Sequence, residues 1–198
     1  MAHQGGILFR ELMKGGFAVG QTEPACGERV GELSGSFLAM EATITIHDLE
    51  LFVGDPEHIG KLSGRVSFPP LGTGIPAMNG EFKLFVPTPD PACKAMMYNL
   101  SFRHDGRDYC LRGSKHVLKR SVVYSWRDTT TLFCRLHDGA TWEAPVIGAG
   151  VLHLKAVEFL NQLMSFRTLN TSSVRDRVGV LARFGTFFAR ELWGSYFG

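Results

Sequence analysis

One short stretch of the sequence, Trp126 to Phe133, carries more side-chain chemistry than any other part of the chain. It places an aromatic ring at Trp126, a cation at Arg127 and a carboxylate at Asp128, with three threonine hydroxyls directly after them. The stretch lies inside a run, Val122 to Leu136, that is typical of a β-strand, and strands rarely carry so many hydrogen-bonding groups in their middle. The sequence therefore predicts one of two roles, a polar belt that holds a sheet together or a cavity wall that holds a ligand.

The side chains around Asp128 are those best suited to contact a ligand. Lys115 and His116 precede the stretch by only a short segment, so a turn can bring them beside Arg127 and Asp128, where Asp128 would hold a polar ligand group or orient a water molecule. The structural alternative has Asp128 and the threonine hydroxyls bonded to backbone and to Arg127, as buried polar groups usually are. The residues that we predict to bind a ligand are Trp126, Arg127, Asp128, Thr130, Lys115, His116, Tyr98 and Phe82.

Several familiar chemistries have no motif in this sequence. There is no G-x-G-x-x-G fingerprint, no Walker A loop and no G-x-S-x-G nucleophile elbow. The seven histidines form no H-x-x-x-H pair, and no His/Cys cluster has zinc spacing. We therefore expect no cofactor, no metal ion and no catalytic activity of the protein's own. The enzymatic alternative is a barrel enzyme of the isomerase or cyclase type that uses Asp128 with Lys115 or His116.

Composition and charge narrow the class of protein further. The chain has 198 residues, a formal charge of +2 and no run of Lys or Arg, which argues for one domain and against a nucleic-acid partner. No signal peptide is evident, and no apolar run approaches the roughly 18 residues that a transmembrane helix needs. The four cysteines are widely spaced, so we expect reduced and mostly buried thiols in a cytoplasmic protein.

Most of the chain has the alternating pattern of half-buried strands. The clearest alternation runs from Leu38 to Ile46, and Arg65–Phe68 and Glu81–Val86 are expected to be further strands. Residues 1–35 are rich in glycine and hold only one short apolar segment, Ile7–Met13, so we assign them to an N-terminal segment that precedes the strands.

The firmest local prediction is a β-hairpin centred on Asp105–Gly106. Asp-Gly is the preferred centre of a type I′ turn, whose two central residues both need positive φ. The register that follows places Phe102 opposite Tyr109 and Arg103 opposite Asp108, and both pairs are favourable across a strand ladder.

The spacing of apolar residues becomes helical after Leu154. We expect one helix over residues 156–166 and a final helix that begins after Ser173, where Ser173 and Asp176 can form a capping box. The final helix has an apolar face that runs from Val174 to Leu192.

Seven or eight consecutive strands followed by two helices predict a mainly β fold. We expect an antiparallel up-and-down β-barrel of the lipocalin (calycin) type, with the helices closing one end or covering an open edge. A barrel of about eight strands has room inside for side chains or one small ligand. We assign a single domain with the N-terminal segment at 1–35, the barrel at 36–154 and the helices at 155–198. The alternative is a two-sheet β-sandwich.

Several motifs of the chain resemble those of a known domain. They are carried by Phe9–Gly15, Trp126–Phe133, Phe159–Leu163 with Phe166, and Phe184–Gly185. They resemble an accessory domain of bacterial, often actinobacterial, proteins that accompanies GMC-type, cholesterol-oxidase-like flavin oxidoreductases and is in some cases joined to an α/β-hydrolase. The resemblance covers nearly the whole chain. It implies a role with lipid, sterol or other apolar substrates but no oxidase activity, because the flavin-binding glycine fingerprint is absent.

Two non-catalytic functions follow from the pattern and the resemblance. The first is a binding or carrier domain for a small hydrophobic ligand, lipid-like or sterol-like, that serves an oxidoreductase; ligand pockets of this kind are mostly apolar with a few placed polar groups. The second is a protein–protein docking module for a GMC oxidoreductase or hydrolase that uses Phe188 and Leu192 of the final helix. In either case we expect an apolar small molecule or such an enzyme as partner, and no transmembrane segment.

Overall fold

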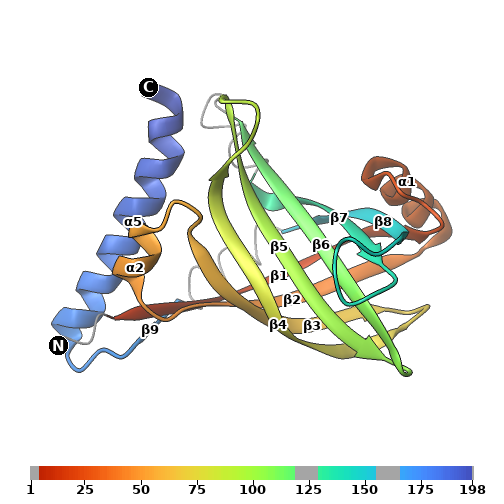
Figure 1. Ribbon diagram of the computed structural model, residues 1–198, viewed down its shortest axis with the longest axis horizontal. Coiled ribbons are helices and arrows are strands. Elements are labelled where there is room, and N and C mark those ends of the chain that lie inside the picture. Colours follow the sequence, from red (N-terminus) through yellow and green to blue (C-terminus); the bar gives the residue numbers. More distant parts are fainter. Residues whose placement is uncertain (1–4, 119–128, 155–165, 198) are drawn as a thin grey trace.

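The strands of the protein form one closed antiparallel barrel (Figure 1). The computed structural model describes residues 5–118, 129–154 and 166–197, with backbone only for 192–197. Eight strands follow one another around the barrel in chain order, β1 pairs with β2 to close the ring, and a short ninth strand lies beside β1. The predicted up-and-down barrel is therefore confirmed, and the sandwich alternative is wrong. The strands are β1 Gly6–Val19, β2 Phe37–Ile46, β3 Ile59–Phe68, β4 Gly72–Pro87, β5 Cys93–His104, β6 Arg107–Leu118, β7 Thr131–His137, β8 Val146–His153 and β9 Arg167–Leu169.

The barrel begins at β1, so the assignment of residues 1–35 to a segment before the barrel is wrong. β1 pairs with β2 in the register that places Ile7 opposite Ile46 and Gly16 opposite Phe37. The glycines of this segment made it look like a loop in the sequence, but they have a packing role. A Cβ atom on Gly16 would lie 2.4 Å from the carbonyl oxygen of Glu28. Glycine inside a strand often marks such a close approach of another backbone.

That backbone belongs to helix α1, Pro24–Ser34, which follows β1 directly. A Cβ atom on Gly27 would lie 1.9 Å from the carbonyl oxygen of Ala149 in β8, and one on Gly31 would lie 2.2 Å from the backbone nitrogen of Phe17 in β1. The helix therefore packs backbone to backbone on β1 and β8, and Figure 1 shows it on the opposite side of the molecule from the C-terminal helix.

The hairpin of β5 and β6 has the predicted geometry. Both residues of the Asp105–Gly106 turn have positive φ, 48° and 78°, as a type I′ turn requires. Phe102 lies opposite Tyr109 and Arg103 opposite Asp108, and the two rings stack with centroids 5.4 Å apart. Local turn chemistry therefore sets the register of these two strands.

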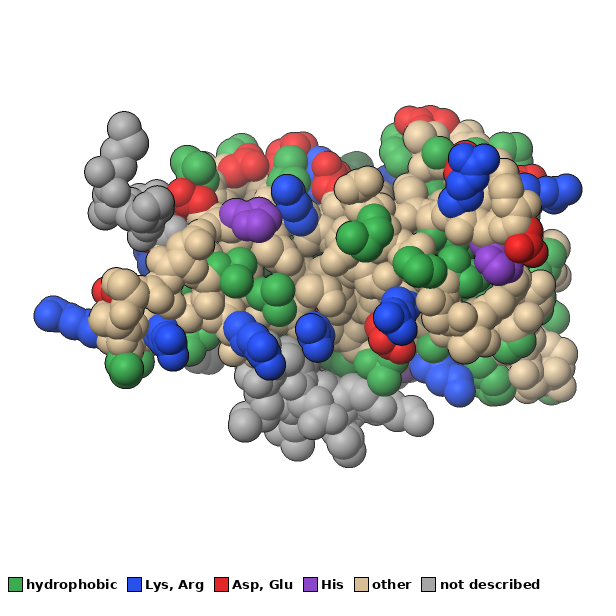
Figure 2. Space-filling model, turned by 90° about the horizontal axis from the view of Figure 1, so that it is seen from below, with side chains coloured by type: hydrophobic (Ala, Val, Ile, Leu, Met, Phe, Trp, Pro, Cys, Tyr) green, Lys and Arg blue, Asp and Glu red, His purple; other side chains and the backbone are tan. Residues whose placement is uncertain are grey.

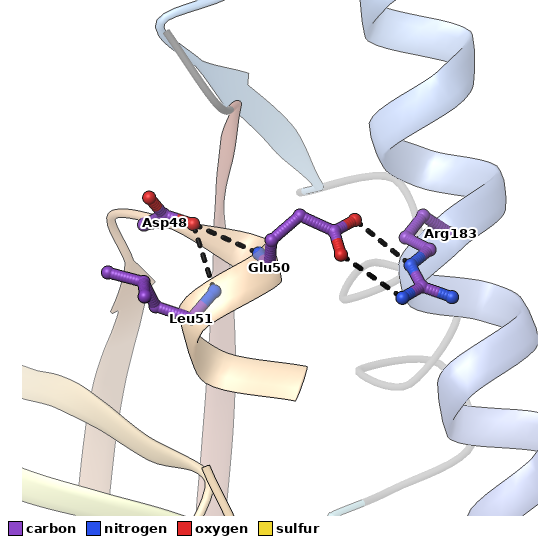
Figure 3. A network of polar contacts seen from close by, with 4 residues as sticks. All are labelled: Asp48, Glu50, Leu51 and Arg183. Carbon is purple, nitrogen blue, oxygen red and sulfur yellow. Dashed lines mark hydrogen bonds and ion pairs between the residues drawn. The ribbon is translucent and has the colours of Figure 1, made fainter. Parts of the chain in front are cut away.

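Helices α2, Leu49–Gly54, and α5, Val174–Phe197, lie side by side at the other end of the barrel (Figure 1). Asp48 caps α2 by accepting hydrogen bonds from the backbone nitrogens of Glu50 and Leu51, both at 3.0 Å. The Glu50 carboxylate then accepts two hydrogen bonds from the Arg183 guanidinium of α5, at 3.0 and 3.1 Å (Figure 3). This bidentate pair joins the two helices at the surface.

The predicted start of α5 is confirmed. The backbone nitrogen of Asp176 donates to the Ser173 hydroxyl at 3.1 Å, and the Asp176 carboxylate accepts from the Ser173 backbone nitrogen at 3.0 Å. These two bonds form the expected capping box. The helix predicted over 156–166 lies almost entirely outside the described residues, with only Phe166 inside them.

The long strand predicted from Val122 to Leu136 is shorter within the described part of the chain. β7 begins at Thr131, and Thr129 and Thr130 lie in a helical turn before it. Residues 121–128 lie outside the described residues.

The outer wall of the barrel is mixed in character: on the face that Figure 2 shows, apolar side chains are scattered among charged ones. Within the described ranges, no helix combines the length and apolar character that a membrane crossing requires.

Candidate functional site

The interior of the barrel is packed with apolar side chains that the alternation of each strand points inward. Their aromatic members dominate, as the composition leads one to expect. The largest side chains that are almost fully covered are Tyr98, Phe17, Phe68, Phe82, Phe85, Lys115, Ile7, Met13, Leu38, Met40, Ile44 and Ile46. One lysine stands out in this set, because Lys, Glu, Arg and Asp are almost never fully buried unless they are paired.

Lys115 belongs to a buried cluster of three polar side chains. Its Nζ atom donates to Oε2 of Glu11 at 3.1 Å, and the hydroxyl of Tyr98 donates to the same oxygen at 2.9 Å. The ammonium also lies 5.0 Å from the centroid of the Tyr98 ring, within cation–π range. The exposed fractions are 7% for Glu11 and 1% for both Lys115 and Tyr98. We call these three residues the interior cluster.

The interior cluster crosses the barrel. Glu11 lies on β1, whereas Lys115 lies on β6, and β7 and β8 stand between these two strands in the ring. A buried ion pair is a weak source of stability, because the desolvation of both ions offsets most of their attraction, and apolar replacements of similar size are often as stable. Stability alone therefore does not account for an ion pair at this position.

Burial governs the chemistry of Tyr98. Removal of the phenol from water is the main cause that raises the pKa of Tyr98 well above its ordinary value, and the nearby Glu11 carboxylate adds to the effect. The phenol stays protonated at neutral pH and acts as a hydrogen-bond donor. Glu11 thus accepts two bonds at one oxygen, which suits an ionised carboxylate.

Aromatic rings continue from the interior cluster toward helix α5. The ring of Tyr98 makes an edge contact with Phe82 at 5.0 Å, and Phe82 meets Phe9 edge-on at 6.3 Å. Phe9 contacts both Phe166, at 5.0 Å, and Phe184 of α5, at 6.0 Å. The α5 end of the barrel is therefore closed by rings, with Phe184 buried among them.

The structure brings together part of the predicted ligand site. Lys115, Tyr98 and Phe82 lie side by side in the interior, as shown by the cation–π contact and the ring contact. Thr130 is buried as well, and its backbone carbonyl accepts a hydrogen bond from the nitrogen of Leu154 at 2.8 Å. Trp126, Arg127 and Asp128 lie outside the described residues.

The structure does not bring His116 together with Lys115, although both were predicted to contact the ligand. Successive side chains of a strand point to opposite faces. Lys115 points into the barrel, whereas His116 is exposed on the outer wall and stacks on Phe133 with centroids 6.0 Å apart.

Sequence reasoning missed Glu11, the acidic partner in the cluster. Glu11 shares the inward parity of Phe9 and Met13, and a lone carboxylate at such an apolar position in a strand indicates a buried, paired acid. The signal was present but depended on recognition of β1 as a strand, which the surrounding glycines prevented.

The cysteines offer no reactive thiol in the interior. Cys93, Cys110 and Cys134 are buried, as predicted, whereas Cys26 on α1 is exposed. Burial raises the pKa of the Cys110 and Cys134 thiols, which disfavours the nucleophilic thiolate. Among the residues that the structure describes, no three His, Cys, Asp or Glu side chains gather in a way that could hold a metal ion.

The fold and the site define a closed up-and-down β-barrel with an ion pair and a tyrosine in its apolar interior. Comparison with protein-family models, curated proteins and solved structures finds no match for this chain. The resemblance to a domain that accompanies GMC-type oxidoreductases therefore stays a prediction.

Proposed function

We propose that this protein binds a small apolar ligand, lipid-like or sterol-like, whose polar head meets the interior cluster. The observation that supports this proposal is the placement of Lys115, Glu11 and Tyr98 in an interior that is otherwise apolar. Small-molecule sites in proteins have this composition, with many apolar contacts and a few polar groups that orient the ligand. Eight-stranded barrels are also of the size that can hold one such molecule.

A ligand has to displace side chains in order to reach the interior cluster, because Phe82 and Lys115 are each only 1% exposed. Met13, Met40 and Met96 are buried in the same core, and the unbranched methionine side chain adapts readily to a new neighbour. These methionines allow the interior to change shape while the strands stay fixed.

The α5 end is the side from which a ligand would arrive. α5 buries Phe184 and Phe187 against the core, while most of its outer surface faces solvent. Two contacts join α5 to α2: the exposed ion pair of Arg183 and Glu50, a kind of pair that contributes little to stability, and the packing of Phe187 on Phe52. Opening of the barrel at this end would require α5 to move and its buried rings, Phe184 and Phe187, to leave the core.

A ligand screen tests the proposal directly. The purified protein is titrated with fatty acids, fatty alcohols, alkanes and sterols, and binding is followed by the displacement of an apolar fluorophore and by the thermal midpoint. We expect saturable binding and a rise in the midpoint for at least one class, since a ligand that binds only the folded state stabilises it. The absence of both effects for every class would exclude ligand carriage.

A second function, docking to an oxidoreductase or hydrolase, is favoured by a stripe on α5. Val174, Val178 and Leu181 are 74%, 60% and 41% exposed, and their spacing places them on one helical face. Phe188, which sequence reasoning assigned to this role, is half-buried and packs on Phe85 at 5.1 Å, while the side chain of Leu192 lies outside the described residues. Co-purification of a flavin oxidoreductase or hydrolase, lost on Val178→Glu with Leu181→Glu, would favour docking over carriage.

The enzymatic alternative is weakened by the orientation of its proposed residues. It requires Asp128 to act with Lys115 or His116, and these last two residues point to opposite faces of β6. An enzyme with its active site inside the barrel could therefore use Lys115 but not His116.

A further inference from the structure

We infer that the head group that meets the interior cluster is an uncharged carbonyl oxygen, as in an apolar ketone, aldehyde or ester, and that Lys115 donates to it. This inference rests on the proposed function and specifies the chemical class of the ligand.

The charge of the interior cluster disfavours an anionic ligand. Lys115 is the one buried Lys or Arg among the residues that the structure describes, and Glu11 already neutralises it at 3.1 Å. Among the described residues, a carboxylate ligand would add a second negative charge next to Glu11 with Lys115 as the one buried Lys or Arg to balance both, and an unpaired charge in an apolar interior is strongly unfavourable. An uncharged head leaves the ion pair balanced.

Lys115 has hydrogen-bonding capacity that a ligand could use. An ammonium group carries three N–H donors. In the described ranges, Nζ has one hydrogen-bond acceptor, Oε2 of Glu11, while the face of the Tyr98 ring provides a weaker electrostatic contact. A ligand oxygen that accepts a hydrogen bond would satisfy a buried donor.

The same geometry favours a carbonyl over a hydroxyl group. Oε2 of Glu11 already accepts hydrogen bonds from both Lys115 and Tyr98. A hydroxyl ligand brings a donor of its own, which needs an acceptor besides Oε2, whereas a carbonyl oxygen only accepts and needs only the Lys115 donor. A carbonyl is therefore the head group that needs the fewest new hydrogen-bonding partners.

The surroundings of Lys115 suit the apolar remainder of such a molecule. Met96 lies directly opposite Lys115 in the pairing of β5 with β6, and Phe82 packs on Tyr98 beside it. Both side chains are buried and apolar. An alkyl chain or ring attached to the carbonyl would pack against these two side chains.

The experiment compares four ligands of similar length: methyl undecyl ketone, lauryl alcohol, lauric acid and dodecane. Dissociation constants are measured by displacement of an apolar fluorophore, and the C=O stretch of the isotope-labelled ketone is followed by infrared difference spectroscopy. We expect the ketone to bind about tenfold to a hundredfold more tightly than dodecane, because a hydrogen bond to a charged group has about that effect. Its C=O stretch should move to lower frequency on binding.

Variants assign the effect to Lys115. Lys115→Met should remove both the preference for the ketone and the infrared shift while dodecane still binds. Since this change removes the ammonium bonded to the Glu11 carboxylate, the triple variant Glu11→Leu, Tyr98→Phe and Lys115→Met provides a second test in an interior that lacks all three polar groups. Lys61→Met, which removes an exposed lysine of β3, is the matched control and should behave as the unchanged protein.

The outcomes separate this inference from the proposed function. Equal affinity for all four ligands, or tightest binding of lauric acid, would overturn the carbonyl inference and leave the carrier function standing. Failure of all four ligands and of the wider sterol and fatty-acid screen to bind would overturn both.

Discussion

Lys115 and Glu11 are 104 residues apart in the sequence, yet their side chains meet at 3.1 Å inside the barrel. The pair links β6 to β1, and so connects a late strand of the barrel to the first. Tyr98 on β5 completes the contact at the same carboxylate oxygen. This polar cluster is therefore assembled from three strands, of which only β5 and β6 are related to each other by a local turn.

Removal of one member of the ion pair should be costly, and removal of both should not. Lys115→Met removes the ammonium that lies 3.1 Å from the buried Glu11 carboxylate, and we expect it to lower the free energy of unfolding by about 3–5 kcal/mol. The triple variant Glu11→Leu, Tyr98→Phe and Lys115→Met should return close to the unchanged protein, because it avoids the desolvation of two charges and also removes the hydroxyl that bonds to Glu11. Urea denaturation measures both values.

The control for this prediction is Lys61→Met, on the exposed face of β3. A change at such a surface position should alter stability by no more than about 0.5 kcal/mol. If the triple variant proved as unstable as the single one, the ion pair would be a structural requirement, and the case for its functional role would fail.

Alkaline pH should destabilise the protein through Tyr98. Burial raises the pKa of Tyr98 well above the ordinary 10.0. The folded state therefore holds this proton more tightly than the unfolded state, so the associated stability is fully present below pH 10 and is lost as pH rises toward the folded pKa. Phenolate absorbance and unfolding midpoints between pH 9 and pH 12 should show this loss, which Tyr98→Phe should reduce. Similar pH profiles for the two proteins would contradict the assignment.

The attachment of α5 should depend on its rings more than on its surface ion pair. Phe187 is 7% exposed and contacts both Phe52 of α2, at 5.9 Å, and His58, at 4.9 Å. We expect Phe187→Ala to cost about 3 kcal/mol or more, and to increase hydrogen exchange in α5. Arg183→Gln, which removes the exposed bond to Glu50, should cost at most about 1 kcal/mol. The reverse order of effects would show that the ion pair holds the helix.

Mild acid should loosen the start of α5. Hydrogen bonds from the Ser173 side chain, and then from Ser172, hold the pKa of Asp176 below its usual value. A carboxylate with a lowered pKa supports the folded helix above the pKa of the unfolded chain, and this support is lost as pH falls through the folded value. Amide exchange near Val174 should therefore increase with acid below about pH 4. Asp176→Asn should show the faster exchange already at neutral pH, and unchanged protection in that variant would argue against the capping box.

Local sequence signals decided many elements of this fold. The Asp105–Gly106 turn determines its hairpin because its two residues adopt positive φ readily, and the Ser173–Asp176 box starts α5 because it satisfies backbone donors at a helix end. The alternation of Leu38 to Ile46 was sufficient to predict a strand and its buried face, and consecutive strands of this kind made the up-and-down barrel the simplest topology.

The tertiary structure alone decided the membership of β1 and the composition of the interior cluster. The glycines of β1 looked like a loop because the sequence does not reveal that α1 packs against them, and with the strand unrecognised the inward position of Glu11 was hidden. Lys115 could be chosen from the sequence for its chemistry, but its partner was set by closure of the ring, which places β1 across from β6. Turns and alternation act between near neighbours in the chain, whereas contact between a carboxylate and an amine on distant strands depends on how all the strands curl together.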